Sequence, residues 1–201
     1  MASSHTNLAK FIHWSFILLY LYGLLKQVDD LSELEDNSLL IFETIFATIF
    51  LIIVLMRYFY MRRFETMHAS NVPVHKVHKF IAKTVHRSMY ICLILLPLSG
   101  LMMAYLYTQG ITDGPLQLAA IAVHETSATL SYVLIIVHIS AAIYSRIKGE
   151  GVWSSMVPIL KEKGPNENEL VKRIADFENR VYDKIGELVP FSESLEEDNN
   201  S

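Results

Sequence analysis

Four long stretches almost without charge constrain this chain most strongly. Residues 11–25, 88–112 and 126–145 contain no Asp, Glu, Lys or Arg, and residues 39–56 contain only Glu43. A helix needs roughly 17–25 predominantly apolar residues to cross a bilayer. The four stretches therefore predict an all-α integral membrane four-helix bundle. They exclude a soluble enzyme, a disordered chain and a nucleic-acid-binding domain, so nucleic acid is not an expected partner.

The first charge-free stretch and the lone cysteine each allow one possibility to be tested against the sequence. Lys10 stands before the first stretch, whose length would also suit a signal peptide, but no small-residue cleavage site follows Leu25. We therefore expect a retained first span. The lone Cys92 provides neither a disulfide framework nor a Cys-based zinc or iron–sulfur site within the chain.

Basic residues are unevenly distributed among the predicted loops. Residues 57–87 contain seven Lys or Arg and one acid, whereas residues 26–36 contain one base and five acids. The loop around Gly110 contains only Asp113, and Arg146, Lys148 and further lysines follow the fourth stretch. Because short cytoplasmic loops carry the excess of Lys and Arg, both termini are predicted to be cytoplasmic.

The chain is predicted to have two parts, a membrane bundle over 1–160 and a cytosolic tail over 161–201. Six apolar residues of the tail recur every three or four positions: Leu170, Ile174, Phe177, Val181, Ile185 and Leu188. This spacing predicts an amphipathic helix over about 167–189. Such a helix could lie on the membrane, pair with a second copy, dock a protein partner or pack on its own bundle. The acidic stretch Ser192–Ser201 is predicted to be disordered.

Two histidines share the fourth span. Fourteen residues separate His124 from His138, which is about 21 Å of helical rise and a return to the same face within roughly 40°. Small residues, among them Ala128 and Ser131, lie between them on that face. Ionisable residues within membrane spans are expected to be functional.

Depth along the spans pairs one of these histidines with His13. His13 lies three residues after Lys10, and His138 lies eight residues before Arg146, so both belong near the cytoplasmic face. Two facing imidazoles suit the axial positions of a haem iron. The alternative is a pair of hydrogen-bonded histidines without iron.

The residue at the depth of His124 on the second span is Glu43, a carboxylate where a second imidazole would complete an outer site. Fourteen residues further, on the same face, Arg57 is placed either to pair with a haem propionate or simply to anchor the span. Arg62 and Arg63 are further candidates for the propionate.

These motifs, in this order, resemble those of the bacterial cytochrome b-561 family over about residues 8–160. They are Ile12-His13-Trp14, Leu55-Met56-Arg57, His86 followed by Pro97–Met103, His124-Glu125 and His138–Ala142. The resemblance implies two stacked haems, with His13 and His138 ligating the cytoplasmic one and His124 the outer one. It also implies that His86 is not an axial ligand and that the second-span ligand is replaced by Glu43.

The replacement leaves three outcomes for the outer site. The outer haem is absent, which leaves one haem b; or Met102 or Met103 supplies the ligand, which gives two. In the third outcome Glu43 itself ligates or leaves the iron five-coordinate. His75 and His78, an H-x-x-H pair, could hold a metal or sit beside a quinone, but a solvated loop is the favoured interpretation.

The resemblance implies a bacterial inner-membrane cytochrome that exchanges single electrons with quinone, an oxidoreductase if it acts as an enzyme. Membrane lipid and quinone are the expected partners, with protein partners or self-association through the C-terminal helix. The alternatives are a haem-containing anchor subunit of a respiratory or hydrogenase-type complex, superoxide oxidation at the outer face, and a scaffold that has lost haem.

Overall fold

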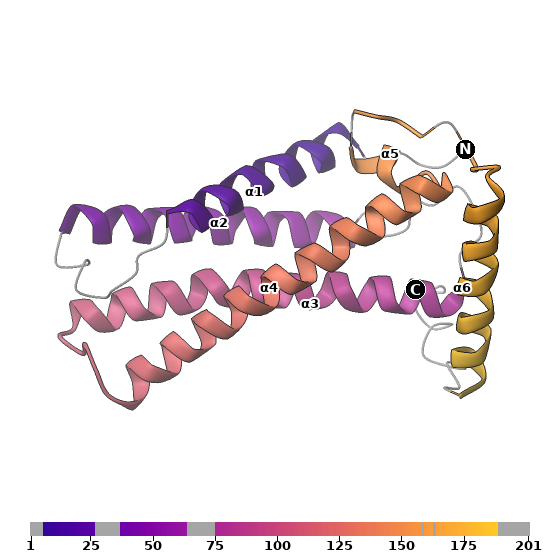
Figure 1. Ribbon diagram of the computed structural model, residues 1–201. Coiled ribbons are helices and arrows are strands. Elements are labelled where there is room, and N and C mark those ends of the chain that lie inside the picture. Colours follow the sequence, from indigo (N-terminus) through magenta and orange to yellow (C-terminus); the bar gives the residue numbers. More distant parts are fainter. Residues whose placement is uncertain (1–5, 27–36, 64–74, 158, 163, 189–201) are drawn as a thin grey trace. The chain divides into compact units, whose positions relative to one another are not determined.

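The described part of the chain is built from helices. The computed structural model describes residues 6–26, 37–63, 75–157, 159–162 and 164–188. In chain order its helices are α1 (Asn7–Leu25), α2 (Asn37–Arg63), α3 (Lys76–Thr108), α4 (Pro115–Lys148), α5 (Val152–Met156) and α6 (Glu169–Leu188) (Figure 1). The helices α1 to α4 are each long and apolar enough to cross a membrane. The predicted all-α fold with four membrane spans is thus confirmed.

The chain divides into two compact units, which we describe separately. The bundle unit comprises His5–Met67 and Val85–Ile139, so it holds α1, α2, the later part of α3 and most of α4. The end unit comprises Met1–Ser4, His68–Thr84 and Ser140–Ser201, and it holds the start of α3, the end of α4, α5 and α6. The helix α6 lies within the predicted 167–189. The acidic stretch 192–201 lies outside the described residues.

Aromatic and aliphatic side chains of three spans form the core of the bundle unit. The core cluster consists of Phe16 from α1, Phe50 and Val54 from α2, and Tyr90 and Leu93 from α3. The rings of Phe16 and Phe50 have centroids 5.4 Å apart. Large apolar side chains elsewhere on the spans are exposed, as expected for surfaces that face lipid.

Glycines follow the C-terminal ends of α3 and α4. Gly110 follows α3 with φ +75°, and the N–H of Ile111 donates to the carbonyl of Leu106 at 2.9 Å. Gly149 follows α4 with φ +78°, and the N–H of Glu150 donates to the carbonyl of Ser145 at 3.2 Å. Both ends have the left-handed glycine and the six-to-one hydrogen bond of a Schellman motif.

Candidate functional site

Three histidines and an arginine line one small cavity inside the bundle unit. His13 comes from α1, Arg57 from α2, His86 from α3 and His138 from α4, and the cavity volume is about 40 Å³. The imidazole rings of His86 and His138 lie edge to face, with centroids 4.9 Å apart. The structure therefore brings together His13, His138 and Arg57, which the sequence placed at one depth.

The rest of the cavity wall is mostly apolar, contributed by Phe16, Val54, Met89, Tyr90 and Leu93. Helical periodicity explains the lining, because His13 and Phe16, like Val54 and Arg57, are three residues apart and share a helix face. The guanidinium of Arg57 donates to the carbonyl of Ala9 at 3.4 Å. Imidazoles are iron ligands and a guanidinium pairs with carboxylates, so the donor set suits a haem with its propionates.

His86 lines the same cavity, and the family resemblance implies that it is not an axial ligand. Its position next to Arg87, the charge that precedes the apolar stretch of α3, predicted that it lies near the level of His13 and His138, where it could donate a hydrogen bond to a propionate or a quinone carbonyl. The edge-to-face contact with His138 makes it a neighbour of a predicted ligand. A histidine in that position can orient the second imidazole or move a proton.

His124, the predicted ligand of the outer site, faces α3. Its Nδ1 lies 3.1 Å from the hydroxyl of Ser99. The imidazole also packs against Gly100, where an added Cβ would lie 3.5 Å from the ring, an ordinary van der Waals contact. Met102, one of the two methionines considered as substitute ligands, is 48% exposed, and Met103 is half-buried.

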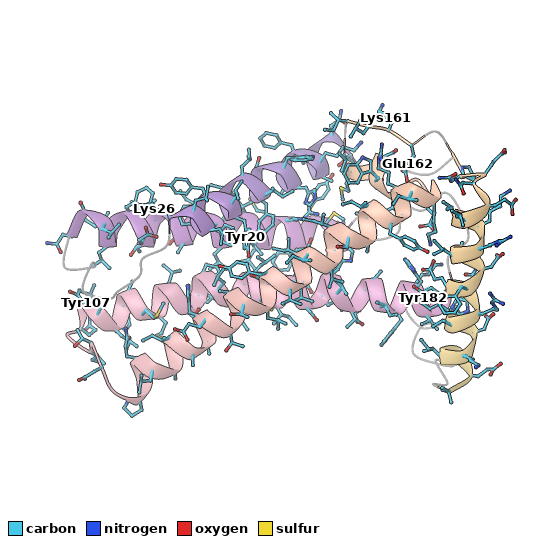
Figure 2. The ribbon with its side chains drawn as sticks, in the orientation of Figure 1. Tyr20, Lys26, Tyr107, Lys161, Glu162 and Tyr182 are labelled. Carbon is cyan, nitrogen blue, oxygen red and sulfur yellow. The ribbon has the colours of Figure 1, made fainter. Side chains whose placement is uncertain are left out.

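Glu43 has a basic partner that the sequence did not predict. The ammonium of Lys26, just after the end of α1, lies 3.5 Å from a carboxylate oxygen of Glu43, and it also lies 3.8 Å from the centroid of the Phe42 ring. Figure 2 shows Lys26 at this end of α1. Next to the pair, Phe46 fills the space above Gly23, where an added Cβ would come within 3.1 Å of the ring. The carboxylate is thus held by a cation and flanked by aromatic rings.

A polar contact joins α1 and α4 between the two histidine levels. Ser131 is fully buried. Its hydroxyl donates to the carbonyl of Ala128 at 2.7 Å. Because the serine proton is used in this way, Tyr20 donates its own hydroxyl proton to Ser131 over 2.8 Å. Tyr20 lies between the helices in Figure 2.

His75 and His78 lie in the end unit, where both contact α6. His75 Nε2 is 3.2 Å from a carboxylate oxygen of Asp183, and His78 Nδ1 is 3.2 Å from the hydroxyl of Tyr182. His78 is in the first turn of α3 rather than in a solvated loop, which corrects the favoured interpretation of the sequence. Within the described residues no group of three or more His, Cys, Asp or Glu could hold a metal ion.

Comparison with protein families gives one result. Residues 4–158 match the model of a family described as prokaryotic cytochrome b561. The match covers the four spans and stops before α6. Comparisons with characterised protein sequences and with solved structures give no match.

Proposed function

Because the chain belongs to the prokaryotic cytochrome b561 family of membrane b-type electron-transfer proteins, we propose that it holds haem b between His13 and His138 and exchanges electrons with quinone. One observation carries this proposal: these two histidines and Arg57 come from three different helices and line one cavity. When bound, the haem would supply a reversible one-electron iron couple.

The protein residues would set the properties of that couple. His13 and His138 would hold the iron, and Arg57 would compensate a propionate charge. The core around Phe16 and Leu93 excludes water, which lowers the local dielectric and strengthens these charge interactions. A cavity of about 40 Å³ cannot contain a macrocycle, so binding would require flexible side chains such as Met89 to move aside.

We propose one haem per chain rather than two. Glu43 stands where the family pattern has a histidine, and its carboxylate is engaged by Lys26. His124 is engaged by Ser99. The Lys26–Glu43 pair and the neighbouring Phe46 ring do not resemble an axial-ligand site, because they offer no neutral imidazole. An acidic residue at this end also disfavours an anionic substrate such as superoxide.

A groove on the bundle unit supports the quinone link. It has a volume of about 1050 Å³ and is formed by α1 and α2. Its lining is Leu8, Ile12, Ile52, Leu55, Met56, Phe59, Tyr60, Arg62 and Arg63. Ile12 and Met56 are the sequence neighbours of His13 and Arg57, so an apolar quinone in the groove would lie close to the proposed haem.

The distribution of Lys and Arg supports a cytoplasmic location for both termini and for the loop between α2 and α3, in a bacterial inner membrane. With that orientation, the proposed haem and the groove would lie near the cytoplasmic face. Reporter fusions at both termini test the orientation, and a periplasmic signal from either fusion would refute it.

Haem content per polypeptide tests the proposal directly. The purified protein should show a Soret band that shifts on reduction, with one haem per chain by the pyridine haemochrome assay. His13→Ala should lose the haem, and His124→Ala should keep it. Glu43→His should raise the haem count. A wild-type count of two would refute the single-haem proposal, and a protein without a Soret band would refute any haem role.

Reduction by a quinol separates the quinone link from the haem. If the haem is present and dithionite reduces it, a soluble quinol should reduce it as well, and Phe59→Ala in the groove should slow that reduction. A haem that dithionite reduces but quinol does not would refute the quinone link alone.

A further inference from the structure

The helix α6 is held in the end unit by a polar network centred on Glu178. The carboxylate of Glu178 accepts hydrogen bonds from Lys148 at 2.8 Å, Tyr144 at 2.9 Å and Tyr182 at 2.8 Å. His78 Nδ1 lies 3.6 Å from the same carboxylate. In Figure 2, Tyr182 lies on the side of α6 that faces the start of α3. Polar contacts thus tie α6 to the end of α4.

The apolar stripe of α6 points in another direction. Five of its six residues are exposed, Leu170 68%, Ile174 53%, Phe177 62%, Val181 37% and Leu188 81%, and Ile185 is half-buried. Counting about 100° per residue, Glu178 and Tyr182 lie about 80° and 120° round the helix from Leu170. One side of α6 thus contacts the other elements of the end unit, and the stripe lies beside that side. An exposed apolar surface of this size marks an interaction site.

Charges are ordered along the other edge of the stripe. Three basic residues lie about 40–80° round the helix axis from Leu170, on the side opposite to Glu178: Lys184, Arg173 and Arg180. All three are exposed. The acidic residues Glu169, Asp176 and Glu187 lie further round the helix, away from the stripe. Basic residues at the border of an apolar face can keep their stems in the apolar phase while the charged heads reach phosphate groups.

We infer that α6 lies on the membrane surface at the Lys148 end of α4, with its apolar stripe in the acyl boundary of a bilayer that contains anionic lipid. Lys148 is the last residue of the span α4, and its ammonium lies 2.8 Å from Glu178. The middle of α6 is therefore tied within one side chain of the end of a membrane span. A bilayer surface runs next to this position, and its anionic headgroups complement the row of Lys184, Arg173 and Arg180.

Site-directed spin labelling of the full chain tests this position. In a Cys92→Ala background, one label replaces Phe177 on the stripe and another replaces Asn179 on the opposite face. The protein is placed in nanodiscs of phosphatidylcholine with phosphatidylglycerol. We expect the label at 177 to be shielded from a water-soluble relaxation agent and accessible to oxygen, and the label at 179 to show the reverse.

Two results would overturn the inference. One is equal access of the aqueous agent to both labels. The other is shielding at 177 together with dipolar broadening between two chains in one disc, which would identify a second copy as the occupant. Hydrogen exchange of residues 169–188 in the unlabelled protein gives the same answer if a labelled variant misfolds, because membrane contact should slow exchange only when anionic lipid is present.

The charge row is tested separately from the stripe. Three variants test the row: Arg173→Gln, Arg180→Gln and Lys184→Gln. Each should lower the equilibrium constant for binding of α6 to the surface of an anionic disc about fivefold. Lys172→Gln is the matched control, since Lys172 is also exposed on α6 but lies about 160° from Leu170. An equal effect of the control and the row variants would refute the part of the inference that assigns the row to anionic headgroups.

Discussion

Replacement of Glu178 by glutamine should release α6 from the ends of α3 and α4. Glutamine keeps the shape but offers one acceptor oxygen, and its amide group meets the donors of Lys148, Tyr144 or Tyr182. Hydrogen bonds to charged groups are worth about 1.5–3 kcal/mol each. Lys148 keeps Glu150, 2.7 Å away, so it is not left unpaired. The side chain of Glu178 is 16% exposed, so water replaces part of the loss. We expect a cost of about 2 kcal/mol.

Hydrogen exchange with mass spectrometry measures this cost. At about 1.4 kcal/mol per tenfold change, the amides of residues 169–188 should exchange about thirtyfold faster. Glu187→Gln is the matched control, because Glu187 is exposed on the same helix and should have no effect. If Glu178→Gln leaves the exchange of α6 within twofold of wild type, the network does not hold the helix and the reasoning is wrong.

The same carboxylate predicts how the docking of α6 depends on pH. Burial alone would raise the pKa of Glu178, but the hydrogen bonds from Lys148, Tyr182 and Tyr144 outweigh it and lower the pKa. A lowered folded-state pKa means that the contribution is complete above the unfolded value of about 4.3 and is lost as the pH falls through the folded value. Exchange of α6 should accelerate below about pH 4 in wild type. In Glu178→Gln that acid-dependent step should be missing.

Further predictions concern the helix ends and the membrane interior. Gly149→Ala should destabilise the end of α4 strongly, because an added Cβ would clash with the backbone carbonyl of Gly164. Gly110→Ala, where nothing lies within 4 Å, should cost only the left-handed strain of about 1–2 kcal/mol, and equal melting temperatures for the two variants in detergent would contradict the clash. Ser131→Ala should cost about 1 kcal/mol, because Tyr20 loses its acceptor, and Tyr20→Phe with Ser131→Ala should cost less than the sum of the single changes. Strict additivity in that double-mutant cycle would show that the two hydroxyls do not interact.

The sequence predicted the features that depend on the position of a residue along a helix, namely the four spans and the level of each polar residue within them. Charge-free stretches locate the spans, and a fixed rise per residue converts the positions of His13, Arg57 and His138 into one level of the bundle. The family match over residues 4–158 agrees with the resemblance found in these motifs. The assignment of His13 and His138 as ligands stays a prediction.

The direction in which a side chain points across the bundle was harder to predict. Tyr20 and Ser131 are 111 positions apart, and no periodicity links them. Lys26 was counted only as a loop charge, although it lies beside Glu43. The apolar stripe of α6 left open what the helix contacts, and the hydrogen bonds of Glu178 with Lys148 and Tyr144 of α4 could not be predicted from it. Such pairings depend on tertiary structure, which helical spacing does not encode.

The hydrogen bond between Tyr20 and Ser131 bears on how the chain is assembled during synthesis. Tyr20 lies in α1 and Ser131 lies in α4, so the span with Tyr20 leaves the ribosome earlier. Until α4 has entered the bilayer, the phenol of Tyr20 has no Ser131 to accept its proton, and an unsatisfied polar group in hydrocarbon is costly. The first span therefore gains its full stability only after the fourth arrives. This order of events favours closure of the bundle as a late and cooperative step of membrane insertion.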